Sequence, residues 1–172
     1  MQTLSLEFDN YIDPLIAVLD KDIEHIDSTV EMLDQLRGMV IKRDDKGLNL
    51  LVEKARIKSQ NYTAIENRRE MIRGELARIW GCRVSEMTLT KIIQILGPER
   101  SEQIRRTRDR LQRRLERFKA EHLSTYMLLS ECSRFNGEML SALLSGRSDE
   151  TTYNRRGSMN RHNGQSFVNM KL

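Results

Sequence analysis

The sequence predicts an all-α protein: an elongated, antiparallel, coiled-coil-like three-helix bundle with one short connecting helix and a disordered C-terminal tail. Three observations lead to this fold class. Apolar residues recur at alternating steps of four and three along three long segments, and only 2 of the 172 residues are proline. Aromatic residues make up 5% of the chain and charged residues 31%, which is typical of long exposed helices rather than of a thick globular core.

The first long helix is expected to begin at Asp13, because an Asp followed by Pro14 is a typical N-cap and first-turn pair. Phe8 and Ile12 can extend its apolar stripe backwards, and Arg37 interrupts the stripe near its end. The stripe residues are Ile16, Leu19, Ile23, Ile26, Val30, Leu33 and Val40. An average step of about 3.5 residues predicts left-handed supercoiled packing against neighbouring helices.

The second long helix follows a break at residues 42–47, with Asp44 or Asp45 as the expected cap. Lys58 and Arg69 interrupt its apolar stripe, which consists of Leu48, Leu51, Ala55, Tyr62, Ile65, Ile72, Leu76 and Ile79. Gly81 is suited to the left-handed position that ends a helix. A short connection between two long stripes predicts an antiparallel hairpin.

Residues 88–96 are expected to form a short helix capped by Thr88 or Ser85. The apolar residues of this segment could also make a strand, but the sequence offers no second strand to pair with it, so we favour the helix. Gly97 and Pro98 end this helix and lead into the third one.

The third long helix is expected over residues 99–144, and no apolar period follows it. Its stripe is formed by Ile104, Leu111, Leu115, Phe118, Leu129, Cys132, Met139 and Leu143, and we expect Leu115 and Ile26 to be buried in the seam. The predicted organisation is therefore a helical bundle domain, residues 1–145, and a flexible tail, residues 146–172.

Charge is distributed unevenly along the chain. Residues 1–45 carry 11 acidic and 4 basic side chains, whereas residues 98–146 carry 7 and 10. An acidic first helix beside a basic second and third helix predicts ion pairs between helices. The basic residues of the third helix are Arg105, Arg106, Arg108, Arg110, Arg113, Arg114, Arg117 and Lys119. Acidic residues are interleaved with them and aromatic residues are not, so a salt-bridged surface is favoured over a nucleic-acid face.

Catalytic and metal-binding patterns do not appear in the sequence. The three histidines lack ligand spacing, and we expect no enzyme activity, no cofactor and no metal site. We expect His122 to be a hydrogen-bonded core residue, and Cys82 and Cys132 to be buried, reduced thiols. The first residues lack the features of a signal peptide, and no run of 18 apolar residues predicts a membrane span.

The last part of the third helix carries more apolar residues than a seam requires. Residues 126–144 hold 11 apolar residues in 19, against 4 in 18 for residues 105–122, and a two-partner seam uses about two in seven. The short helix at 88–96, a second copy of the chain, or a client helix could cover this surplus. The predicted client-binding residues are Tyr126, Met127, Leu128, Phe135, Met139, Leu140 and Leu143.

The tail contains Thr152-Tyr153-Asn154-Arg155-Arg156-Gly157, in which Tyr153 is a lone aromatic residue of the kind that anchors partner surfaces. Together with the order of the preceding helices, this tail resembles that of the FlgN-type flagellar export chaperones. The resemblance covers nearly the whole chain.

The resemblance implies a cytosolic, non-enzymatic chaperone that binds the C-terminal helical segments of hook–filament junction proteins. It implies delivery of these clients to the flagellar type III export apparatus, with Tyr153 docking to an export-gate component. We expect neither a nucleic-acid partner nor insertion into a membrane, and the sequence leaves the oligomeric state open. The alternative is a structural coiled-coil adaptor or oligomerisation module without a delivery role, and a nucleic-acid binder comes third.

Overall fold

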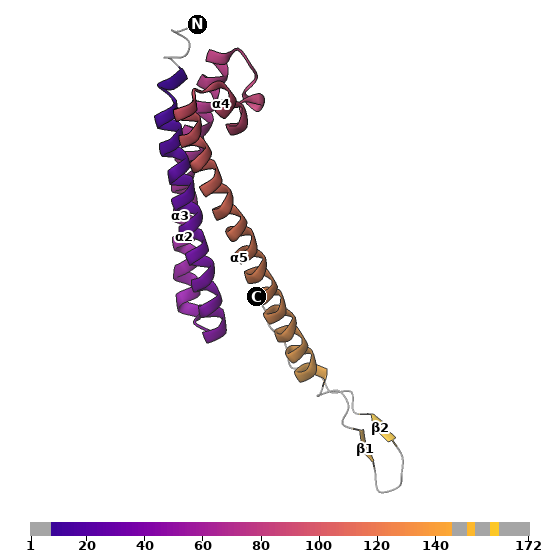
Figure 1. Ribbon diagram of the computed structural model, residues 1–172. Coiled ribbons are helices and arrows are strands. Elements are labelled where there is room, and N and C mark those ends of the chain that lie inside the picture. Colours follow the sequence, from indigo (N-terminus) through magenta and orange to yellow (C-terminus); the bar gives the residue numbers. More distant parts are fainter. Residues whose placement is uncertain (1–7, 146–150, 154–158, 162–172) are drawn as a thin grey trace. The chain divides into compact units, whose positions relative to one another are not determined.

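Three long helices and one short helix form the described part of the chain, which comprises residues 8–145, 151–153 and 159–161 of a computed structural model (Figure 1). They are α2 (Ile12–Lys42), α3 (Asp45–Trp80), α4 (Leu89–Ile95) and α5 (Pro98–Ser145), with a 3-10 turn, η1, at Val84–Glu86. The chain divides into two compact units, residues 1–126 and 127–172. The predicted all-α class, with a short helix at 88–96, is confirmed.

Local signals place most helix ends where the sequence predicts them. The Asp44 side chain accepts a hydrogen bond from the Gly47 backbone N–H at 2.9 Å, and the Thr88 side chain accepts one from the Lys91 N–H at 3.2 Å. Gly81 ends α3 with φ = 70°, a left-handed conformation that residues with a Cβ adopt at a cost. These ends confirm the predicted connections.

The start of α2 differs from the prediction. Asp13 is not the N-cap, because the helix already begins at Ile12 after Tyr11, which makes no side-chain capping bond. Ile12 is fully buried and Phe8 is 2% exposed, so burial against neighbouring helices extends the helix towards the N-terminus. Asp13 lies in the first turn, where its negative charge interacts favourably with the helix dipole and stabilises α2.

The main core lies where the first turns of α2 meet the end of α3, together with α4 and the start of α5. Its buried residues are Phe8, Ile12, Leu15, Val18, Leu19, Ile72, Leu76, Ala77, Met87, Ile92, Ile93 and Ile104. Further along the α2–α3 hairpin, burial is limited to a single seam that includes Ile23, Val30 and Leu51. Most of the fully buried residues therefore lie at one end of the first unit.

The charged interruption at Arg69 has a buried partner on α2. Its Nη1 donates to Asp22 Oδ2 at 2.5 Å, and the Tyr62 hydroxyl donates to Asp22 Oδ1 at 2.8 Å. The Asp22 side chain is 4% exposed. Burial lowers the pKa of Arg69, but hydrogen bonds with Tyr62 and Asp22 outweigh this effect and hold the pKa above its ordinary value.

A series of ion pairs joins α2 to α5 within the first unit. The pairs are Asp13–Arg100 at 2.6 Å, Asp20–Arg110 at 3.3 Å, Asp27–Arg114 at 3.3 Å and Arg37–Glu121 at 2.7 Å. Residue numbers rise together on both helices, so α2 and α5 are parallel and α3 is antiparallel to both. The predicted ion pairing between an acidic first helix and a basic third helix is confirmed.

Several predictions of burial are wrong. Leu115 is 39% exposed, His122 is exposed, and Ile26, Cys82 and Cys132 are only half-buried. Residues in the α5 stripe differ in burial because Ile104 belongs to the main core, which also holds residues of α2, α3 and α4, whereas Leu115 lies beyond it. A heptad pattern marks the inward face of a helix but does not say how many neighbours cover it.

The described residues of the tail contain a short strand pair, β1 (Thr151–Tyr153) and β2 (Met159–Arg161), paired antiparallel with Tyr153 opposite Met159. The sequence prediction placed no regular structure there, because it relied on the missing apolar period. Thr and Tyr favour extended backbone, which accounts for the strand. The remainder of the predicted flexible tail lies outside the described residues.

Candidate functional site

The face of α5 beside its apolar seam changes from polar to apolar close to residue 126. In the first part of the helix, the positions three residues after the seam residues Ile104, Leu111 and Phe118 hold Thr107, Arg114 and Glu121. The next two residues of the same series are Leu128 and Phe135. A face that makes polar contacts with α2 in the first unit therefore becomes apolar in the second unit.

Arg37 marks the end of the polar part. Its guanidinium contacts Glu121 Oε2 at 2.7 Å and donates to the Thr125 hydroxyl at 2.9 Å. Thr125 is 2% exposed, and its hydroxyl also donates to the Glu121 carbonyl at 2.8 Å. Burial and paired acids act on Arg37 in opposite directions, and the acids keep its pKa above the ordinary value. Arg37 thus holds α5 on α2 as far as Thr125.

The predicted client-binding residues lie in the exposed part of α5. The exposed fractions are 65% for Tyr126, 59% for Met127, 56% for Phe135, 47% for Met139, 60% for Leu140 and 69% for Leu143. Leu128 is half-buried. So many large apolar side chains on one helical segment form a surface that normally has a partner.

Helix geometry brings some of these residues together and separates others. At about 100° per residue, Leu128, Phe135, Met139 and Leu143 share one face, and Leu140 lies at its edge. We call these five residues the apolar face. Leu129 and Cys132, assigned from the sequence to the bundle seam, fall on the same side and complete the apolar surface.

Met127 and Tyr126 do not belong to the apolar face. Met127 follows the same line of the helix as Glu131, Arg134 and Glu138. Arg134 pairs with Glu131 at 2.6 Å and with Glu138 at 3.0 Å, so this line is polar and its charges are paired within the helix. Tyr126 lies on a line with Ser130, Ser133 and Gly137, which reaches Leu140 at the edge of the apolar face. The part of α5 that lies in the second unit is therefore amphipathic, with one apolar and one polar side.

Among the possible covers for the apolar face, α4 is already used elsewhere. Ile92 is 1% exposed and Ile93 is 9% exposed, and both belong to the main core of the first unit. The partly buried residues Leu89, Ile95 and Leu96 pack against the same core. The remaining candidates are a second copy of the chain and a client helix.

Tyr153 lies in β1, and its backbone pairs with Met159. The predicted docking residue is thus held in a short hairpin rather than in an isolated extended segment. Hairpin strands of three residues are marginal on their own.

The basic side of α5 is largely neutralised by nearby acids. Arg105 and Arg106 pair with Glu102, Arg108 pairs with Asp109, and Arg110 and Arg114 pair with α2. This pattern confirms the predicted salt-bridged surface. The prediction that no nucleic acid binds here stays a prediction.

Within residues 8–145 and the two strands, no three His, Cys, Asp or Glu side chains come together as a possible metal site. None of the helices in this described part is long and apolar enough to cross a membrane.

Comparison with known proteins gives one family. The family model described as FlgN protein matches residues 8–161, which include all the described helices and both strands. No curated protein and no solved structure matches the chain.

Proposed function

Because the chain belongs to the FlgN family of flagellar export chaperones, we propose that it is a cytosolic, non-enzymatic chaperone for hook–filament junction proteins. It binds the C-terminal helical segments of these clients and delivers them to the type III export apparatus. The observation that carries the proposal is the exposed apolar face of α5 in a chain that matches this family from residue 8 to residue 161.

The apolar face suits a client helix for physical reasons. An amphipathic helix binds a partner through apolar side chains at steps of three and four, and Leu128, Phe135, Met139 and Leu143 offer this spacing. Phe135 supplies a large aromatic anchor, which tends to dominate binding energy. Met139 is flexible enough to repack around different clients.

Paired substitutions test the face. Phe135→Ala and Met139→Ala should each weaken binding of the C-terminal segment of a junction protein from the same genome. Truncating a binding anchor costs about 2 kcal/mol or more, a loss of roughly 30-fold in affinity. Met127→Ala removes the same side chain from the polar side of the same segment, so its affinity should change less than about twofold. Equal losses for Met127 and Met139, measured by calorimetry on folded variants, would refute the assignment.

We also propose that Tyr153 docks to the export gate. Tyr153→Ala should leave the melting temperature and client affinity unchanged but weaken binding to the purified gate domain by roughly 30-fold. Thr152→Ala is the neighbouring control and should bind the gate normally. Equal gate affinities for the wild type and Tyr153→Ala would remove the delivery role from this residue.

A coiled-coil adaptor or oligomerisation module is the second candidate. The exposed Leu129, Met139 and Leu143 continue the coiled-coil rhythm of α5 and could pair with another copy of this helix. An adaptor would form a stable oligomer that Phe135→Ala disrupts, and it would not require Tyr153. Sedimentation velocity of the Phe135→Ala and Tyr153→Ala variants separates the adaptor from the chaperone.

A further inference from the structure

Three hollows follow one side of the α2–α3 hairpin within the first unit. The first, about 310 Å³, is lined by Pro14, Arg68 and Ile72 among others. The second, about 400 Å³, shares Arg68 with the first and adds Val18, Lys21 and Ile65. The third, about 500 Å³, shares Lys21 and Ile65 with the second. Adjacent hollows share lining residues, so they follow one another along the hairpin, and we call the three together the hairpin groove.

The length of the hairpin groove fits a helix. On α2 it runs from Pro14 to Ser28, which is about four turns or roughly 20 Å at 1.5 Å per residue. Residues Pro14, Val18, Lys21, His25 and Ser28 line it at steps of four and three. This is the spacing with which a helix receives a further helix in a bundle.

The floor of the groove is apolar. Val18 is 6% exposed and Ile72 is 3% exposed, and Ile65 between them is half-buried. Met71 stands at the edge with 54% of its surface exposed. Val18 and Ile72 are already covered within the hairpin, so a partner that lays apolar side chains along this floor would bury chiefly Met71 and the accessible part of Ile65, which favours binding.

The sides of the groove carry more basic than acidic residues. Lys21, Lys58 and Arg68 form no ion pair within the described residues. Lys58 interrupts the α3 stripe as Arg69 does, but Arg69 has Asp22 as a partner. The acidic residues Glu24 and Glu75 also line the groove, and Glu75 already pairs with Arg78.

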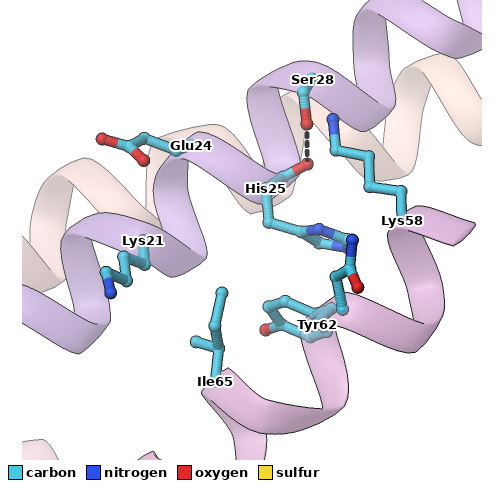
Figure 2. Close-up of a pocket in the computed structure, with 8 residues that line it drawn as sticks. Lys21, Glu24, His25, Ser28, Lys58, Tyr62 and Ile65 are labelled. Atoms are coloured by element: carbon cyan, nitrogen blue, oxygen red, sulfur yellow. Dashed lines mark hydrogen bonds between the residues drawn. The ribbon is translucent and has the colours of Figure 1, made fainter.

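Figure 2 shows the third hollow, where His25 of α2 lies against Tyr62 of α3 and Lys58 extends across the same space. The two rings are stacked with centroids 3.8 Å apart and an interplanar angle of 14°. Burial and then the charge of Lys58 lower the pKa of His25, while Asp22 and Glu66 act in the opposite direction. A carboxylate placed between Lys58 and His25 would be stabilised by the charge of Lys58 and by a hydrogen bond from the neutral His25 ring.

We propose that the hairpin groove is a second docking surface, which takes an amphipathic helix of a partner protein with acidic residues on its flanks. The apolar side chains of that helix lie over Ile65 and Met71, and its carboxylates meet Lys21, Lys58 and Arg68. This surface lies on the hairpin and does not use the apolar face of α5. The apolar floor favours a protein helix over a nucleic acid, whose backbone needs charge along its whole length.

Two synthetic 18-residue helical peptides test the proposal with the full chain. Both carry leucine at steps of three and four, and they differ only in their flanks, which are glutamate in one and lysine in the other. The glutamate peptide should bind at least about tenfold more tightly. Its amide shift changes should map to residues 14–28 and 58–72, and Phe135→Ala, which tests the α5 face, should leave its affinity unchanged.

Charge reversal supplies the matched control. Lys21→Glu with Arg68→Glu should weaken the glutamate peptide by about tenfold or more and improve binding of the lysine peptide. Arg113→Glu with Arg117→Glu makes the same change in net charge on exposed residues of α5, outside the groove, and should change affinity less than about threefold. Three outcomes would overturn the proposal: equal losses in both double variants, shift changes confined to residues 126–144, or displacement of the peptide by a second copy or by duplex DNA.

Discussion

The buried cluster of Asp22, Tyr62 and Arg69 gives the sharpest prediction about stability. Arg69→Met removes the cation from a carboxylate that is 4% exposed, and leaves the Tyr62 hydroxyl as its remaining donor among the described contacts. Breaking a buried ion pair on one side costs about 3–5 kcal/mol. Since the Arg69 side chain is 27% exposed, water can reach the vacated space, and we expect about 3 kcal/mol.

Substitutions of Asp22 and of Arg69 should lower the free energy of unfolding by different amounts. Asp22→Leu leaves a guanidinium that can turn towards solvent and still bond Tyr62, so its loss should be smaller than that of Arg69→Met. The double variant Asp22→Leu/Arg69→Met removes both buried charges and should lie within about 1 kcal/mol of the wild type. Arg56→Met is the control for an exposed pair, with 64% and 61% of the two side chains exposed, and should cost less than about 0.5 kcal/mol.

Urea unfolding followed by circular dichroism measures these differences by linear extrapolation. The expected order of loss is Arg69→Met, then Asp22→Leu, then the double variant and Arg56→Met. If Arg69→Met costs no more than Arg56→Met, the buried pair does not stabilise the hairpin. If the double variant is as unstable as Arg69→Met, the loss comes from packing and the electrostatic argument fails.

Three further predictions concern pH, backbone conformation and the attachment of α5. The folded-state pKa of His25 lies below its ordinary value of 6.5, so the free energy of unfolding should fall as the pH drops below about 6.5. His25→Gln should make the free energy of unfolding, measured by urea titration, depend less on pH. Gly81→Ala should cost about 1 kcal/mol because φ is 70° at this residue. Gly38 has open space around it and an ordinary helical conformation, so Gly38→Ala should stabilise α2 by about 0.5–1 kcal/mol. The opposite sign at either site in urea unfolding would contradict this reasoning. Arg37→Met should cost about 1–3 kcal/mol and raise hydrogen exchange around Glu121, and unchanged exchange would show that α5 is held by other contacts.

The helix pattern and most helix ends could be predicted from the sequence because their causes are local. Asp44 and Thr88 cap the helices that follow them, and Gly81 ends α3, through bonds and dihedral angles set within a few residues. The amphipathic end of α5 was also visible, since its periodicity alone places Phe135 and Met139 on one face. Met127 was included among the predicted client-binding residues for its apolar character, and its angular position places it on the line of Glu131, Arg134 and Glu138.

The aspartates at 13, 20, 27 and 34 are a missed signal, because a seven-residue repeat of acidic residues marks one line along α2. Three of them pair with arginines of α5, while Asp34 pairs with Arg37 on its own helix. The repeat could have identified the line, but the register between helices 84 to 90 residues apart depends on the turn through α4. The α5 residues that pair with these aspartates could therefore not be predicted from local sequence.

The sequence by itself determined the helix class, the breaks between helices and the amphipathic character of α5, since each follows from short-range sterics, capping or periodicity. Only the tertiary structure decided that Ile104 is fully buried while Leu115 is 39% exposed, that Asp22 neutralises Arg69 and that the start of α2 extends beyond Asp13. Burial and ion pairing depend on which distant helix lies opposite a side chain. Equivalent positions in a repeating pattern look alike in sequence, and packing at one end of the bundle makes them different.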